Sequence, residues 1–491
     1  MNRPNILILH ADQHQQTCMG AYGNAEVQTP NMDALARDGV CYTNHFTPYP
    51  VCTPSRYSLL TGLYAHQHLG ASNRCTLPAG LDTFPRILKQ AGYRTAAVGK
   101  MHFTPTYLDV GYERLCLSEQ DGDGRMDDDY HRSLMAKGLW DCADTLEQVN
   151  SYRMTAGEEY WKNFGSRPSD LSEEDYSTPW IAARAAEELD GWTQGGNLLT
   201  VGFIKPHHPF DPPGRWAEYY DPNALTLPEG WQERCPALDF AYAKGFYPNN
   251  TLTEKVLRQC LADYYAAITQ VDEVVGQLIA QLKAKGIYDN TLIVYTSDHG
   301  EYMGFHHMMG KSNFMYDPLM KIPLLVKYPK AANIAPGRDA RLCENVDLAP
   351  TLLRQAGCEI GEFMCGKALT DDAQKGMVFA QLGEDTQFMA RSKTRKLLYC
   401  KNPALHQFFD LEKDPLERCN LYHDPAYQAE IAQYTEALLR WRLLDAPPPI
   451  HLDMAAPITN CSNALHPRDG HREKIEAYMK QKMADYDTNH L

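Results

Sequence analysis

The chain contains 491 residues, of which 44% are hydrophobic and 22% are charged. This length and composition predict a globular protein with a full core and exclude disordered, collagenous and coiled-coil proteins. The 62 acidic residues outnumber the 47 basic ones, and the resulting net charge of -15 argues against nucleic acid as the main partner. No run of about 18 apolar residues occurs, so no membrane span is expected. For an anionic substrate, positive charge would have to be concentrated in the site itself.

The first residues and the cysteines predict a location. Residues 5–9 form a short apolar run typical of a buried strand, without the basic segment, long apolar segment and cleavage site of a secretory signal. The 14 cysteines show no CxxC pair and no framework spacing. We therefore expect reduced thiols and a cytoplasmic protein. The alternative is a periplasmic protein whose signal has been removed.

Up to about residue 330, short apolar runs alternate with longer helical patterns, which predicts a mostly parallel sheet covered by helices. The predicted strands are residues 5–9, 95–98, 198–203, 291–295 and 322–327. Residues 254–285 repeat apolar side chains every three or four positions and predict a long helix. Thr253 is its expected N-cap, and Gly286 is expected just beyond its last turn.

From about residue 370 the pattern changes. Four short, closely spaced segments predict a small antiparallel sheet: residues 377–382, 387–392, 395–400 and 407–411. An amphipathic helix follows at residues 426–443. We divide the chain into a catalytic α/β domain (1–370), a small α+β subdomain (371–446) and a polar tail (447–491). The last helix of the tail, residues 472–483, is expected either to fray or to clamp a second copy of the chain in a homo-oligomer.

The most informative segment is CTPSRYSLLTG, which runs from Cys52 to Gly62. Pro54 suits the first turn of a helix, so Cys52 is expected at a helix N-terminus. Unpaired N–H groups and the helix dipole there favour an anion and would depress the pKa of a thiol. Arg56 adds a positive charge one turn further on. On these features alone, the alternative is a buried structural cysteine.

The pattern Cys-x-Pro-Ser-Arg followed by Leu-Thr-Gly is the sulfatase signature. The chain therefore resembles the type I sulfatases of the alkaline phosphatase superfamily, a group that includes phosphonate monoester hydrolases and choline-sulfatase-like enzymes. The resemblance implies an α/β fold with a mixed, mostly parallel sheet between helices and a small C-terminal antiparallel-sheet subdomain. It also implies that a formylglycine-generating enzyme oxidises Cys52 to formylglycine, whose hydrate is the nucleophile.

Candidate metal ligands follow two predicted strands. Asp12-Gln13 and Asp298-His299 both lie at the carboxyl end of a strand, where α/β sheets build their sites. Oxygen ligands with one histidine favour Ca²⁺, with Mn²⁺ second, over Zn²⁺. The resemblance implies that these four residues and the modified Cys52 hold one divalent metal. Sulfatases usually carry two adjacent acids where this chain has Asp12-Gln13, so a lower metal affinity is expected.

Basic residues also follow the predicted strands. Three stretches match family motifs: Gly-Lys-Met-His at 99–102, Pro-His-His-Pro-Phe at 206–210 and Gly-Lys at 310–311. A single lysine or histidine is usually a surface group, but three matches indicate a cluster that supplies the local positive charge. Of the adjacent histidines, His207 is assigned to the site and His208 to the shape of the loop. His306 and His307 receive little weight, because Phe305 replaces an aspartate of the relatives.

The resemblance implies a role for each residue. Arg56, Lys100 and Lys311 neutralise the sulfate, and His207, with Lys311, protonates the leaving alcohol. His102 takes the proton of the remaining hydroxyl, and the hemiacetal then expels sulfate and regenerates the aldehyde.

One further position bears on the reaction type. Asn73 falls where phosphonate monoester hydrolases keep a substrate-binding asparagine. Those enzymes generally have Tyr and Thr where this chain has Lys100 and His102, so the pair favours a small anionic sulfate ester as substrate. The alternative is a phosphonate monoester or phosphodiester hydrolase, and a more distant one is a non-catalytic metal-binding homologue.

The loops 111–168 and 211–250 are expected to select the alcohol, through aromatic residues that either pack within the loops or stack on a ring: Tyr160, Trp161, Trp216, Tyr219 and Tyr220.

Overall fold

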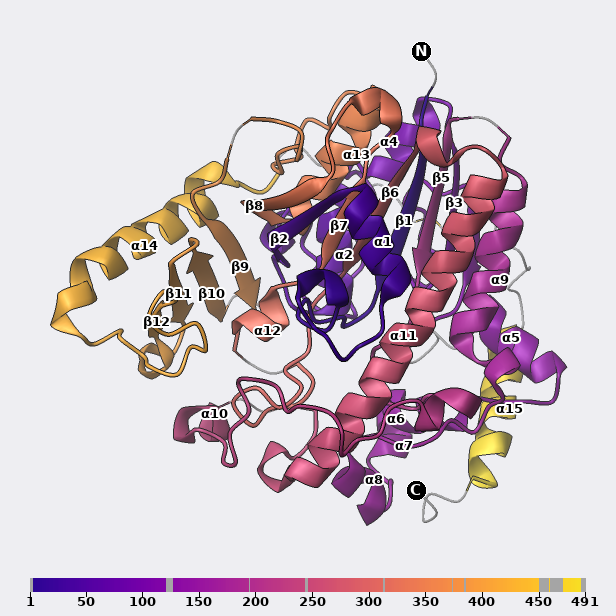
Figure 1. Ribbon diagram of the computed structural model, residues 1–491, viewed down its shortest axis with the longest axis horizontal. Helices are drawn as coiled ribbons and strands as arrows, with labels where there is room; N and C mark the ends of the chain where they lie inside the picture. The colour runs from indigo at the N-terminus through magenta and orange to yellow at the C-terminus, as the bar shows by residue number, and fades with distance from the viewer. Residues whose placement is uncertain are drawn as a thin grey trace.

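The computed structural model describes residues 3–120, 127–193, 195–242, 246–311, 314–372, 374–383, 386–449, 459 and 471–486. Its main element is an eight-stranded sheet with the strand order β4-β3-β5-β1-β6-β7-β2-β8 (Figure 1). Only β7 runs antiparallel to its neighbours, and the other strands share one direction. The strands are β1 (Asn5–Ala11), β2 (Val40–Phe46), β3 (Arg94–Gly99), β4 (Arg114–Leu117), β5 (Asn197–Gly202), β6 (Thr291–Ser297), β7 (Leu324–Lys327) and β8 (Gly337–Glu344).

Helices cover both faces of this sheet, because its central strands are apolar on both sides. In β1, Ile6 and Ile8 enter one core, while Leu7 and Leu9 enter the other. The first core is closed by α2 (Cys52–Thr61), α4 (Phe84–Gln90) and α13 (Leu348–Ala356). The second is closed by α1 (Pro30–Asp38), α9 (Ser177–Asp190) and α11 (Glu254–Ala284). The predicted mostly parallel sheet between helices is confirmed.

The long helix α11 follows the prediction closely. Thr253 caps it by accepting a hydrogen bond from the Val256 amide at 3.4 Å, and Gly286 follows the last turn with a φ of +68°. The five predicted strands are present as β1, β3, β5, β6 and β7. The prediction missed β2, β4 and β8. In β2, Asn44 and His45 interrupt the apolar run, and the first half of β8 is polar and exposed.

A second, four-stranded antiparallel sheet lies to one side of the large sheet (Figure 1). It consists of β9 (Val378–Leu382), β10 (Gln387–Arg391), β11 (Arg395–Cys400) and β12 (Gln407–Asp410), all close to the predicted bounds. Helix α14 (Gln428–Arg440) packs against β10 and β11 through its buried residues Ile431, Tyr434 and Leu438. The boundary predicted at residue 370 falls between α13 and β9.

Most of the remaining helices lie beside the sheet's carboxyl edge (Figure 1). The remaining helices are α3 (Ala65–His68), α5 (Asp129–Ala136), α6 (Cys142–Gln148), α7 (Asn150–Arg153), α8 (Glu158–Asn163), α10 (Ala237–Tyr242), α12 (Asp317–Met320) and α15 (His471–Ala484). No helix in the described ranges is long and apolar enough to span a bilayer. Every cysteine of the described chain is a free thiol, as expected.

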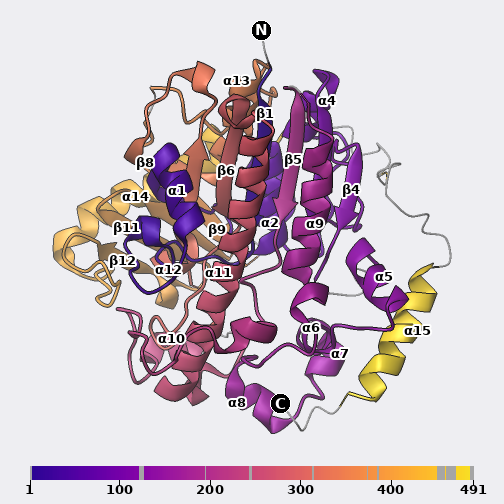
Figure 2. The same ribbon diagram turned by 45° about the vertical axis from the view of Figure 1, so that its right-hand side comes forward.

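The described part of the tail contacts its own chain. Helix α15 packs against α5 and α6, and both views place it beside α5 (Figures 1 and 2). Ile475 is buried there, the rings of Tyr478 and Trp140 lie 5.9 Å apart, and Lys482 Nζ donates to the Gly138 carbonyl at 2.6 Å. The tail helix is therefore docked rather than frayed. The homo-oligomer stays a prediction, and residues 450–458, 460–470 and 487–491 of the tail lie outside the described residues.

Candidate active site

Four neighbouring strands bring the predicted residues together. The strands β3, β5, β1 and β6 are adjacent in the sheet, and at their carboxyl ends the chain continues into Lys100, His207, Asp12 and Asp298. Parallel strands end at one edge, so these side chains meet although they are far apart in sequence. Cys52, the first residue of α2, is fully buried beneath them.

Cys52 lies at the centre of this group. Its Sγ is 3.0 Å from Lys311 Nζ, 3.3 Å from His299 Nε2 and 3.7 Å from Asp12 Oδ1. The expectation that the helix N-terminus depresses the pKa of the thiol is wrong. Burial, together with the Asp12 carboxylate, raises the pKa of Cys52 to about 11. An unmodified thiol here is protonated at neutral pH and is a poor nucleophile.

A buried set of metal-ligand types surrounds the Cys52 sulfur. One ligand atom from each of Asp12, Cys52, Asp298 and His299 lies within 4.8 Å of the others. The His299 Nδ1 is 2.9 Å from the Gly300 carbonyl, which fixes the proton on Nδ1 and leaves the Nε2 lone pair facing the cluster. The cluster therefore fits a divalent cation.

Gln13 adds a fifth candidate ligand. Its Nε2 donates to Glu301, and its buried Oε1 has no hydrogen-bond partner among the described residues. The residue has a φ of +64°, and its amide donates to Asp298 Oδ1 at 3.0 Å, so the backbone turns back toward the cluster. An amide oxygen left without a donor is the group that a cation would satisfy.

Two buried cations hold the carboxylates ionised. Arg56 reaches Asp298 Oδ2 through Nε at 3.0 Å and Asp12 Oδ2 through a terminal nitrogen at 3.1 Å. Lys100 Nζ is 2.8 Å from the same oxygen of Asp12. Burial works to raise the pKa of Asp12, but the charges of Lys100 and Arg56 hold the pKa well below its usual value. Whether Arg56 and Lys100 also contact the sulfate stays a prediction.

Lys311 and His207 form a pair beside the sulfur. Lys311 Nζ is 3.3 Å from His207 Nε2, and His207 Nδ1 is 2.6 Å from the His208 carbonyl. Burial, followed by the neighbouring His208, lowers the pKa of His207 well below its usual value. Burial works to lower the pKa of Lys311, but Cys52 and Asp12 outweigh it and raise that pKa. His207 is therefore neutral and Lys311 carries the proton.

His102 and Asn73 lie at the start of α2. The Asn73 Oδ1 accepts from the Thr53 amide at 3.1 Å, and the Thr53 hydroxyl donates to the His102 carbonyl at 2.8 Å. His102 has a φ of +60°, and Glu119 accepts a hydrogen bond from its amide at 3.0 Å. Both predicted residues line the cavity that opens onto Lys311.

The cavity has a volume of about 540 Å³, and its outer wall comes from α7 and the residues around it. None of the five aromatic residues predicted to pack or to stack lines it. Tyr160 donates to Glu147, Trp216 is buried beside Tyr219, and Tyr220 shares a hydrogen bond with Thr269. Tyr160, Trp216 and Tyr220 therefore pack within the loops, and Phe246 is an aromatic side chain that does line the cavity.

Several buried residues of the site were not predicted. Glu301 bonds Gln13, Glu119 holds the backbone of His102, and Gln120 accepts from Lys100 Nζ at 3.1 Å. His208 does more than shape the loop. Its Nδ1 lies 2.5 Å from Glu147, and its ring stacks on His207 with the ring centroids 4.1 Å apart. No motif marks these acids in the sequence.

His306 and His307, which received little weight, lie outside the site. The His306 Nδ1 is 3.2 Å from Asp239, and the His307 ring stacks on Trp231.

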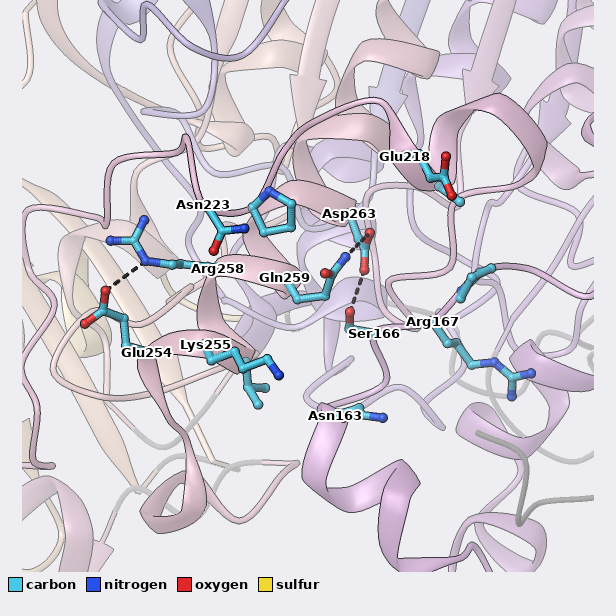
Figure 3. A pocket seen from close by; sticks show the side chains of 14 residues that line it. Asn163, Ser166, Arg167, Glu218, Asn223, Glu254, Lys255, Arg258, Gln259 and Asp263 are labelled. Carbon is cyan, nitrogen blue, oxygen red and sulfur yellow. Dashed lines mark hydrogen bonds and ion pairs between the residues drawn. The ribbon is translucent and has the colours of Figure 1, made fainter.

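A second, larger cavity of about 800 Å³ contains none of the predicted residues. Figure 3 shows that its wall is formed by the first turns of α11 and the chain that follows α8. Asp263 is buried there and is hydrogen-bonded to Ser166 and Gln259. Arg258 is paired with Glu254 at 2.8 Å. Acidic and basic side chains are mixed in this cavity.

A comparison with known families identifies the family of the chain. A family model described as Sulfatase matches residues 4–358. The chain belongs to the sulfatase family. The arylsulfatase of Clostridium perfringens is a sulfatase relative with 27% identity over 474 residues, which cover 89% of this chain and 94% of that protein. This sulfatase is therefore an enzyme, a hydrolase of the alkaline phosphatase superfamily. Its membership of the family supports sulfate ester hydrolysis as its reaction.

Other similar proteins show how broad the relationship is. A multifunctional alkaline phosphatase superfamily protein of Trinickia caryophylli is 28% identical to this sulfatase over 505 residues, covering 91% of this chain and 96% of that protein. The crystal structure of the phosphonate monoester hydrolase of Agrobacterium radiobacter aligns with a TM-score of 0.75 and 24% identity, over 90% of this chain and 96% of that one. The latter similarity establishes the fold alone.

Proposed function

We propose that this sulfatase cleaves a sulfate monoester to an alcohol and sulfate, with formylglycine formed from Cys52 as the nucleophile. The observation that carries this proposal is the position of Cys52 Sγ, 3.0 Å from Lys311 Nζ and 3.3 Å from His299 Nε2. In the mature protein an oxygen of the formylglycine hydrate would stand where the sulfur lies. The raised pKa of the Cys52 thiol supports this conversion, because the unmodified group is not ionised.

Asp12, Gln13, Asp298 and His299 would hold one divalent cation together with the modified Cys52. The hard oxygen ligands favour Ca²⁺, with Mn²⁺ second. When bound, the cation supplies Lewis-acid polarisation and lowers the pKa of a coordinated hydroxyl. Asp12 is suited to this role because Lys100 and Arg56 already hold its pKa low.

The leaving alcohol needs a proton, and the pair of Lys311 and His207 can supply it. Lys311 is protonated, and His207 is neutral with its Nε2 facing the ammonium. We propose that the proton delivered to the alkoxide originates on Lys311 and that His207 orients it. His102 would take the proton of the second hydroxyl, after which the C–O bond to sulfate breaks and the aldehyde re-forms. Lys311 and Arg56 supply the charge that stabilises the transition state.

A second candidate is the hydrolysis of phosphonate monoesters or phosphodiesters with the same nucleophile. The contact of Asn73 with the amide of Thr53, next to Cys52, favours it. Lys100 and His102 favour sulfate, and we rank sulfate ester hydrolysis first. The cytoplasmic location and the partner formylglycine-generating enzyme belong to the same proposal.

Mass spectrometry and activity together test the nucleophile. In protein from a host with a formylglycine-generating enzyme, the Cys52 peptide should be about 18 Da light, the difference between a thiol and an aldehyde. Aryl sulfate turnover should follow the fraction converted, and Cys52→Ser should remove it. Full turnover by protein with an intact thiol would contradict the proposal.

A further inference from the structure

The described residues that line the active-site cavity include basic side chains and no acidic ones. Among the described residues that line it are Arg74, Arg153 and Lys311, together with three histidines, and no carboxylate. This is unexpected in a chain with 62 acidic residues and a net charge of -15. Clefts lined by one sign of charge concentrate ligands of the opposite sign.

The proposed reaction uses Lys311 but leaves the two arginines unexplained. Arg153 is held with its guanidinium carbon 3.8 Å from the centre of the Phe246 ring, and it donates to Asn150 Oδ1 at 3.1 Å. Arg74 is exposed at the rim. Within the described chain neither arginine has a carboxylate partner. Elsewhere in the described chain, some exposed arginines are paired with acids, as Arg215 is with Glu173 and Glu273, whereas others, such as Arg37 and Arg338, are not.

The second cavity shows that this distribution is particular to the active site. Figure 3 draws Arg167, Lys255 and Arg258 in that cavity beside three acids, Glu218, Glu254 and Asp263. A ligand there would meet both signs of charge. In the active-site cavity, the described lining would present a second anion with cations and neutral groups only.

We propose that the alcohol part of the substrate carries a second anionic group, which Arg74 and Arg153 bind while the sulfate ester lies against Lys311. This inference rests on the proposed function and narrows its substrate class. A carboxylate and a second sulfate share the required chemistry, since the planar guanidinium pairs with either through two parallel hydrogen bonds. A cationic alcohol such as choline is disfavoured by the same charges.

Three aryl sulfates test this inference: one without a second charge, one with a ring carboxylate and one with a second sulfate. In the mature wild-type enzyme, we expect the two dianions to have a higher kcat/KM than the singly charged ester. The double variant Arg74→Gln/Arg153→Gln should lower their kcat/KM by at least about tenfold and leave the singly charged ester within about twofold. Arg37→Gln, an exposed substitution on α1 away from this cavity, is the matched control. Loss for only one dianion identifies whether carboxylate or sulfate is the bound group.

Binding gives an answer that does not require turnover. In a Cys52→Ala background, calorimetry should show weaker binding of the dianions when both arginines are replaced, and unchanged binding of the singly charged ester. Equal effects of the arginine substitutions on all three esters would overturn the inference. So would a preference for the singly charged ester in the protein that keeps both arginines. A clear difference in binding, with no sulfate release by the mature enzyme that keeps Cys52, would instead count against the proposed reaction and leave the anion subsite standing.

Discussion

The carboxylate of Glu147 lies 2.5 Å from Nδ1 of His208, and both side chains are buried, with His208 in the wall of the active-site cavity. Tyr160 and Tyr247 also donate to Glu147. Burial works to raise the pKa of Glu147, but His208 lowers it, so the glutamate is ionised. The carbonyl of His208 lies 2.6 Å from Nδ1 of His207. By holding His208, Glu147 therefore also fixes the His207 ring, which faces Lys311.

Replacing Glu147 with Gln should lower kcat by about tenfold with little change in KM, because the substitution removes the charge that orients His208. The acidic limb of the kcat profile should move as well, since His207 loses its fixed geometry. Tyr160→Phe is the matched control, because it removes one donor to Glu147 but keeps the carboxylate, and it should stay within about twofold. Equal effects of the two substitutions on kcat and on the pH profile would show that Glu147 is merely structural.

Metal removal tests the cluster around Cys52. Exhaustive chelation should abolish turnover and lower Tm, because a cation that binds only the folded state adds stability in proportion to its affinity. Ca²⁺, or Mn²⁺ as second choice, should restore both. Asp298→Asn should weaken the Tm response to Ca²⁺ by removing one charged ligand. Unchanged rates after verified metal removal would refute the site.

Lys100 and His102 are expected to separate sulfate from phosphonate chemistry. The double variant Lys100→Tyr/His102→Thr removes the ammonium that lies 2.8 Å from Asp12 and the proposed base. Sulfatase kcat/KM should fall by at least about 100-fold, which is the usual contribution of one acid–base group. Activity on an aryl phosphonate monoester should fall less or rise. Proportional losses on both substrates would show that this pair does not set specificity.

Asp263, in the second cavity, should make stability depend on pH. Burial raises the pKa of Asp263 from 3.8 to about 7, so between these values the folded state binds the proton that the unfolded state has released. The contribution of this group to the free energy of unfolding therefore falls as the pH rises from about 4 to 7, by at most about 1.4 kcal/mol per unit, and is constant above that range.

Asp263→Asn keeps a polar side chain beside Ser166 and removes the charge. The Tm of this variant minus the Tm of the wild-type protein should rise as the pH is raised from 5 to about 7 and should then level off. Asp289→Asn, whose carboxylate is 69% exposed, provides the control and should show no such trend. A Tm difference that does not vary with pH would contradict the assignment.

The sequence predicted most of the fold and brought together the residues at the strand ends, for a local reason. Asp12, Lys100, His207 and Asp298 each follow a strand whose apolar run is easy to recognise, and the sheet joins them at one edge. The reversed direction of β7 could not be predicted, because a strand's composition does not encode the direction of its neighbours.

The contributions of Glu147 and Arg153 were missed for a different reason. These residues come from short helices between β4 and β5, where no periodic pattern or motif fixes their orientation. Their roles depend on contacts with His208 and Phe246, which are distant in the chain. Long-range pairings of this kind appear only once the fold is known.

The docking of α15 on α6 has a practical consequence for handling the protein. Gln148, the last residue of α6, lines the active-site cavity, and Asn150 in the next helix does so too. An affinity tag fused to the C-terminus, or a truncation at residue 446, would therefore act on a helix that braces the substrate-facing wall. Expression with the tag at the other end of the chain leaves this brace intact, and kinetic comparisons between differently tagged preparations should be read with that in mind.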